Sequence, residues 1–336
     1  MQRTSPDFPA QAAVWTVTDG HAGNVRQAEA LAVALAGSFH AWTLQPRAPW
    51  RWLAPRRLPG ATQAFGVDFA TASTRPSLAI GCGRQAALAT RLLRDRGART
   101  VQILDPRIDL RHWDLVIAPE HDGLSGENVI PVIGSLHPVD DLWLATARGA
   151  FPGLGNLPGP RTAILLGGES AHARFTDDDY DGWLRAIARI VRAEGGSALA
   201  TTSRRTPRSA RARLQQRLGD LPGVRWTGEA DGPNPYAGLL AWADRIVCTA
   251  DSVNMVSEAS ATLAPVFVAG HDRVSGRPRR FLDGLLRSGR VRPLDATLTP
   301  YAVTPLRETA RVAAEVRAWL DDRASRSNAT QTALGY

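Results

Sequence analysis

Apolar, strand-like runs alternate with helix-like runs along almost the whole of this sequence. Runs such as 13–18 and 162–166 are short, rich in aliphatic residues, and followed by polar turns that contain glycine. The segments after these turns, such as 25–36 and 177–192, place apolar residues at helical spacing. Because a helix returns the chain to the start of the next strand, such strands pair in parallel. The alternation predicts an α/β fold with doubly wound parallel sheets.

The predicted elements occupy both halves of the chain. Strands are predicted at residues 13–18, 41–44, 77–80, 101–104, 115–118, 129–133, 162–166, 198–202, 224–226, 246–248 and 265–268. Helices are predicted at residues 25–36, 84–96, 177–192, 207–218 and 305–321, with a further short helix after Asp251. Each half therefore forms an α/β series of its own.

The length of the chain favours two domains. A sequence of 336 residues, 44% of them hydrophobic, can bury a core in each half. Segment 151–160 is too rich in Pro and Gly for a regular element, so we predict a linker there, between domains over 1–150 and 161–323. Residues 324–336 have the composition of a disordered tail. Two doubly wound domains that face one another would leave a ligand cleft at the carboxyl ends of both sheets.

The charge of the chain limits the class of partner. The formal net charge is +8, and every basic residue is arginine, since the sequence contains no lysine. Arginine binds phosphate and carboxylate well, so we expect an anionic ligand or an anionic membrane surface. Nucleic acid is not expected as a partner, because no DNA- or RNA-reading motif is present.

The compartment is predicted from the apolar runs and the cysteines. No apolar run approaches ~18 residues and no secretory signal opens the sequence, which favours a cytoplasmic protein, soluble or peripheral on the inner face of the membrane. Cys82 and Cys248 each lie beside an apolar strand-like run. We predict that both are buried free thiols, as is usual in a reducing compartment.

The turn after the first predicted strand carries candidate catalytic residues. Gly20 and Gly23 let the backbone approach a ligand closely, and Asn24 can cap the helix that follows. His21, next to Asp19 in this turn, could act as the general base on an acceptor hydroxyl. The alternative is a histidine that only bonds loop carbonyls. The turn has neither the dinucleotide nor the Walker signature.

Segment 249–270 reads as strand end, polar turn, short helix and second strand. Asp251 and Ser252 stand where they can cap the helix. The start of a helix offers unpaired N–H groups and a positive dipole end, which suit a diphosphate. Glu258, one to two turns further on, is placed to accept bonds from sugar hydroxyls. This combination predicts a nucleotide-sugar pocket.

Other charged turns follow predicted strands. Gly168 lies in a Gly-Gly turn, and Ser203 with Arg204 forms a candidate phosphate clamp, for which the alternative is a solvated basic helix entry. Arg84 begins a helix, where the dipole disfavours a cation unless an anion lies nearby. The acidic and histidine cluster at 120–122 matches no standard metal spacing, so neither a metal nor another cofactor is expected.

Segment 50–59 interleaves tryptophan with arginine. Trp50 and Trp52 alternate with Arg51, and Arg56 and Arg57 follow. Such a segment can lie on an anionic membrane surface. The alternative is an amphipathic loop that covers the N-terminal sheet.

Together these motifs resemble the "elongated mitochondria" family of mitochondrial-fission proteins, in its bacterial branch. The resemblance rests on W-T-V-T-D-G-H-A-G-N at 15–24 with Gln27, Gly167-Gly168, T-S-R-R-T-P at 202–207, N-P-Y at 234–236 and T-A-D-S-V-N-M-V-S-E-A at 249–259. It covers residues 13–321. Plant members are associated with recruiting the fission machinery to mitochondria, so the resemblance also implies an alternative function as a catalytically silent scaffold or membrane-recruitment protein.

More distantly, the chain is similar to GT-B glycosyltransferases of the MurG-like group. That similarity implies two Rossmann-like domains, a nucleotide-sugar donor, and metal-independent transfer to an acceptor that is lipid-linked or envelope-associated. The acceptor side is expected in the N-terminal domain and the donor side in the C-terminal domain. The expected donor-binding residues are Gly168, Ser203, Arg204, Asp251, Ser252, Asn254, Met255, Ser257 and Glu258, and the expected catalytic residues are His21 and Asp19. The sugar-reading glutamine of that group has no counterpart near residues 271–280.

Overall fold

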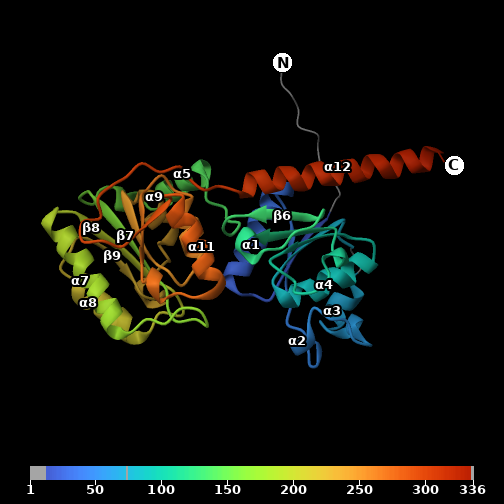
Figure 1. Cartoon of the computed structure of the whole chain (residues 1–336), viewed down its shortest axis with the longest axis horizontal. Helices are drawn as coiled ribbons and strands as arrows, with labels where there is room; N and C mark the ends of the chain where they lie inside the picture. The colour runs from blue at the N-terminus through green and yellow to red at the C-terminus, as the bar shows by residue number, and fades with distance from the viewer. Residues whose placement is uncertain (1–12, 73–74, 334–336) are drawn as a thin grey trace, which may run out of the picture. The chain divides into compact units, whose positions relative to one another are not determined.

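The computed structural model describes residues 13–72 and 75–333. The chain divides into two compact units. Unit 1 contains the residues up to Pro138 and those from Glu308 onward, and unit 2 is Val139–Arg307. Each unit has a six-stranded parallel sheet flanked by helices (Figure 1). The predicted fold class, two doubly wound Rossmann-like domains, is confirmed.

Unit 1 is built on the strand order β2-β1-β3-β4-β5-β6. Its strands are β1 Val14–Thr18, β2 His40–Thr43, β3 Leu78–Cys82, β4 Arg99–Ile103, β5 Leu115–Pro119 and β6 Val129–Val132. Its helices are α1 Ala22–Ala36, α2 Trp50–Leu53, α3 Val67–Thr71, α4 Arg84–Asp95 and α12 Thr309–Ala333. Aliphatic residues of α1 and α12 cover one face of the sheet, and residues of α3 and α4 cover the other.

Unit 2 has the strand order β12-β11-β10-β7-β8-β9. Its strands are β7 Arg161–Leu166, β8 Ser197–Thr202, β9 Gly223–Trp226, β10 Arg245–Thr249, β11 Val266–Ala269 and β12 Val291–Pro293. Its helices are α5 Asp141–Ala150, α6 Pro152–Gly155, α7 Asp177–Ala193, α8 Arg208–Leu218, α9 Tyr236–Trp242, α10 Val253–Ser260 and α11 Gly276–Arg287. One face packs against α5, α9, α10 and α11, and the other against α7 and α8.

The first domain boundary differs from the predicted linker at 151–160. The chain enters unit 2 already at Val139, and α5 and α6 pack on α9. Leu154 is buried in the core of this unit. A Cβ added to Gly155 would lie 2.6 Å from the indole of Trp242, so this glycine permits close packing. Gly155 therefore permits a tight helix contact inside unit 2.

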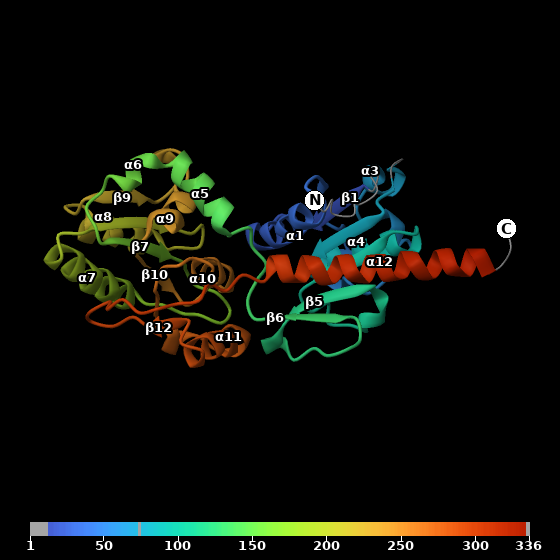
Figure 2. The same ribbon diagram turned by 90° about the horizontal axis from the view of Figure 1, so that it is seen from above.

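Residues 324–333 of the predicted disordered tail are helical, and residues 334–336 lie outside the described residues. α12 begins at Thr309 and continues to Ala333, beyond the predicted helix end at residue 321. No Pro or Gly interrupts the sequence in this stretch, so helix growth is not stopped. α12 lies along α1 in unit 1 (Figure 2), where Val312, Ala313 and Val316 are buried. The C-terminal helix therefore belongs to unit 1.

Each sheet has one switch point, where the chain leaves the first strand on one side and later returns to its other side. In unit 1 the switch point lies between β1 and β3, and in unit 2 between β7 and β10. Ligands of open α/β sheets bind outside the carboxyl ends of the strands at such a point. The turns after these four strands therefore define the candidate sites.

Candidate functional site

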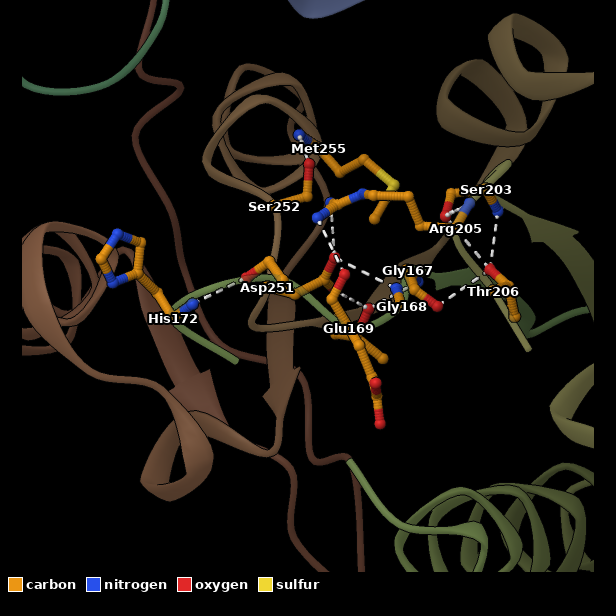
Figure 3. A network of polar contacts seen from close by, with 12 residues as sticks. Gly167, Gly168, Glu169, His172, Ser203, Arg205, Thr206, Asp251, Ser252 and Met255 are labelled. Atoms are coloured by element: carbon orange, nitrogen blue, oxygen red, sulfur yellow. Dashed lines mark hydrogen bonds and ion pairs between the residues drawn. The ribbon is translucent and has the colours of Figure 1, made fainter. Parts of the chain in front are cut away.

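The turns after β7 and β10 are joined by hydrogen bonds at the switch point of unit 2. Asp251 Oδ2 accepts two hydrogen bonds, one from the amide of Gly168 at 3.1 Å and one from Nη2 of Arg205 at 2.7 Å (Figure 3). Asp251 Oδ1 accepts a hydrogen bond from the hydroxyl of Thr249 at 2.7 Å. The same hydroxyl accepts a hydrogen bond from the amide of Gly167 at 2.7 Å. Three turns, after β7, β8 and β10, are thus held by one carboxylate.

The two glycines after β7 leave no space for a side chain. A Cβ on Gly167 would lie 2.0 Å from Asp251 Oδ1, and one on Gly168 would lie 2.0 Å from the carbonyl oxygen of Arg205. Because the second contact is with backbone, a side chain there would displace the loop between β8 and α8. The Gly-Gly turn is therefore required for the close approach of these loops.

Asp251 is a positioning residue in this arrangement. Its side chain is 0% exposed, whereas that of Arg205 is 46% exposed. Burial raises the pKa of Asp251, while the Thr249 hydrogen bond, the Arg205 charge and the Gly168 amide lower it. A buried carboxylate does not attract phosphate, but it fixes the guanidinium of Arg205, which does. We therefore interpret Asp251 as the residue that orients Gly168 and Arg205.

Helix α10 starts directly after this junction. Ser252 is its N-cap, and Ser252 Oγ accepts the amide of Met255 at 3.3 Å. The other amides of the first turn, including that of Asn254, have no acceptor within the helix and face its start. Asn254 and Met255 are half-buried, while Ser257 and Glu258 are buried at 1% and 2% exposure. The start of α10 thus provides N–H donors beside Arg205.

The turn after β8 differs in detail from the predicted clamp. The hydroxyl of Ser203 bonds that of Thr206 at 3.1 Å and accepts the amide of Arg205 at 3.2 Å, which shapes the turn. The side chain of Arg204 is exposed, and it is Arg205 that reaches Asp251. The sequence analysis did not select Arg205 as a site residue. A buried Asp251 needs a cation beside it, and this requirement could have pointed to the arginines after β8.

Asp19 and His21 lie together at the switch point of unit 1. His21 Nδ1 lies 3.0 Å from Asp19 Oδ1, and the same oxygen accepts the His21 amide at 3.1 Å. The His21 side chain is 79% exposed and that of Asp19 is 15% exposed. Because a carboxylate only accepts, Asp19 favours the tautomer with the proton on Nδ1 and a free lone pair on Nε2. This geometry suits a general base.

Asn24 is not the cap that the sequence predicted. His21 occupies the N-cap position of α1 and makes no side-chain capping bond. Asn24 lies in the first turn, where Nδ2 donates to Asp19 Oδ1 at 3.0 Å and Oδ1 accepts from Cys82 Sγ at 3.6 Å. Because Asn24 lies inside the first turn, its side chain bonds Asp19 and Cys82 and does not cap the helix. Gly20 and Gly23 stand on either side of His21, before and inside the helix.

Backbone carbonyl oxygens accept hydrogen bonds from the cation at the start of α4. Arg84 Nη1 donates to the carbonyl oxygens of Trp52 and Ala54, both at 2.8 Å, and Nη2 donates to that of Arg51 at 3.3 Å. The arginine at the start of α4 therefore fastens the α2 segment to unit 1. Its role is structural.

The prediction for the two cysteines is confirmed. Both Cys82 and Cys248 are free and buried, as predicted. None of the described helices is long and apolar enough to cross a membrane. Within the same residues, no group of three or more His, Cys, Asp or Glu side chains is arranged to hold a metal ion.

The sequence matches one known protein family over most of its length. The model of the family described as "Mitochondrial fission ELM1" matches residues 22–320. This chain belongs to the mitochondrial fission ELM1 family. The ELM1 protein of Arabidopsis thaliana is 31% identical over 273 residues. That match covers 72% of this chain and 63% of the plant protein, so this chain spans under two thirds of that relative.

Solved structures of similar fold include a sugar-nucleotide epimerase and a glycosyltransferase. A UDP-N-acetylglucosamine 2-epimerase of Methanocaldococcus jannaschii matches with a TM-score of 0.54 and 10% identity, over 91% of this chain and 99% of that one. The calicheamicin glycosyltransferase CalG4 matches with a TM-score of 0.51 and 14% identity, over 94% and 100%. Because both identities are low, the likeness concerns the fold alone. This ELM1 family member has the GT-B-like fold.

Proposed function

We propose that the protein binds a nucleotide-sugar through unit 2 and transfers the sugar to an acceptor. The observation that carries this proposal is the junction of Gly168, Asp251 and Arg205 at the switch point, directly before α10. The amides at the start of α10 and the half-exposed Arg205 offer positive charge to a diphosphate there. The fold neighbours, which include a UDP-sugar epimerase and a glycosyltransferase, support this class of ligand.

In this proposal the donor is bound by residues that follow β8 and β10. The amides near Ser252 and Asn254 bind the diphosphate, and Glu258 accepts hydrogen bonds from the ribose. Ser203 and Arg204 add a polar rim after β8. The positive helix end and the arginines stabilise the departing nucleoside diphosphate without a bound metal ion.

Unit 1 supplies the acid–base chemistry in this proposal. His21 Nε2 takes the proton of the acceptor hydroxyl, and Asp19 keeps the imidazole oriented through Nδ1. The acceptor is a lipid-linked or envelope-associated alcohol. The protein then works in the cytoplasm or on the inner face of the membrane.

A second candidate function is a catalytically silent scaffold that retains the fold and recruits a partner. The match to the mitochondrial fission ELM1 family favours it, because the plant relative is named for its part in organelle fission. A wild-type protein that binds no nucleotide would support the scaffold. Saturable nucleotide binding together with sugar transfer would support the enzyme.

The proposed donor site predicts the effect of Glu258→Ala. Loss of a charged acceptor for ribose should weaken nucleotide binding by about 1–3 kcal/mol, measured by calorimetry. Because Glu258 is 2% exposed, the alanine variant also removes packed atoms. Glu258→Gln keeps the volume and serves as the second variant, with thermal unfolding as the test of folding. Unchanged affinity in both folded variants would remove Glu258 from the donor site.

A further inference from the structure

The α2 end of unit 1 carries an exposed tryptophan among arginines. In Figure 1, α2 lies at the lower edge of this unit, on the opposite side from α12. Trp52 is 69% exposed and Leu53 is 41% exposed. Arg47, Arg51 and Arg56 are exposed as well, and within the described residues none of them forms an ion pair. These five residues are called the Trp52 surface.

The two tryptophans of α2 have different roles. Trp50 is half-buried and packs against the cluster of Ala54, Ala64 and Leu88. It therefore fastens α2 to the rest of unit 1. Trp52 stands two residues further along the same short helix and is largely exposed. Only Trp52 is available to an external partner.

The backbone around Trp52 is already hydrogen-bonded. Arg84 occupies the carbonyls of Arg51, Trp52 and Ala54, and Arg91 Nη1 donates to that of Pro55 at 2.6 Å. The amides of residues 51–54 and 56 donate to carbonyls within the segment. Transfer of unpaired backbone groups out of water costs several kcal/mol, so a fully bonded loop enters an apolar boundary more easily. The α2 segment thus presents Trp52 on a backbone whose polar groups are hydrogen-bonded at residues 51–55.

We propose that the Trp52 surface docks this protein on an anionic lipid bilayer. Tryptophan prefers the headgroup boundary, and unpaired arginines are attracted to acidic headgroups. A bilayer supplies negative charge without a fixed register, whereas a protein partner would need carboxylates placed against three separate arginines. One tryptophan and one leucine also offer far less apolar area than a stable protein interface, which buries roughly 800 Å² on each side. The proposal is independent of the nucleotide site.

Vesicle co-sedimentation of the full chain tests the proposal. The wild-type protein should pellet with vesicles of phosphatidylcholine and phosphatidylserine, and should not pellet with phosphatidylcholine alone. Added salt should release it. Trp52→Ser should weaken binding about tenfold or more. A double variant, Arg51→Gln with Arg56→Gln, should weaken it about 30-fold.

Two control variants change exposed residues of unit 2 in the same way. Leu142→Ser alters a side chain with 76% exposure, and Arg287→Gln removes one exposed charge. Both should bind like the wild type. Equal pelleting with neutral vesicles, no pelleting with either kind, or equal losses in the control variants would overturn the proposal. Because the changed residues are exposed, the variants should keep their circular dichroism spectra.

Discussion

A His21→Ala protein is expected to lose about 10²–10⁴-fold in the rate of sugar transfer, while its affinity for nucleotide stays unchanged. The reason is the position of the imidazole, which Asp19 holds through Nδ1 so that Nε2 carries the lone pair. The side chain is 79% exposed, so its removal should not disturb the fold. Steady-state rates with a nucleotide-sugar donor measure the effect.

Two further variants separate a base from a structural histidine. Asp19→Asn should lower the rate as well, because an amide no longer favours the reactive tautomer. His40→Ala, which removes an exposed histidine of β2 in the same unit, should keep the wild-type rate. Full activity in His21→Ala would instead establish that His21 only supports the turn.

Replacement of Arg290 by alanine is expected to lower the free energy of unfolding of unit 2 by about 2–4 kcal/mol. Arg290 is 6% exposed and donates to the carbonyl oxygens that end α10, at 2.8 Å for Ser260 and 2.9 Å for Thr262. Burial lowers the pKa of Arg290 to about 10, so the side chain remains charged at neutral pH. Without it, buried carbonyls lose their donors.

Denaturant unfolding measures this loss, and Arg287→Ala is the matched control. Arg287 ends α11, three residues before Arg290, but is exposed. Its replacement should change the unfolding free energy by less than about 0.5 kcal/mol. Because Arg290 fixes the far end of α10, the Arg290→Ala protein should also bind nucleotide more weakly. Equal stability of the two variants would contradict the structural role of Arg290.

Local sequence patterns predicted every strand of the two sheets except β12. Strands such as β1 and β10 are buried along their whole length, and most of their residues are apolar. Helices such as α7 bury one apolar face, which gives a clear helical period in the sequence. Helix α5 was not predicted, although Asp140 caps it through the amide of Trp143. Strand β12 has only three residues, which is too short for a periodic signal.

The sequence predicted which turns form the candidate site, but it did not predict which side chains in them make contact. Gly168 and Asp251 follow neighbouring strands, and parallel pairing brings such turns together. Which of two adjacent arginines reaches Asp251 depends on the path of the loop after β8, which no sequence period encodes. The hydrogen bonds of the Asn24 side chain likewise depend on Asp19 and Cys82, which the fold brings beside it. Contacts of this kind follow from tertiary structure.

Calorimetric titration of the wild-type protein with UDP, GDP and CMP tests the central claim most directly. Each nucleotide is compared with its own nucleoside, because the claim assigns the phosphates to the start of α10 and to Arg205. We expect one nucleotide to bind saturably and its nucleoside to bind at least about tenfold more weakly, since charged hydrogen bonds contribute about 1.5–3 kcal/mol. Absence of binding by all three nucleotides, or equal affinity for nucleotide and nucleoside, would contradict the claim.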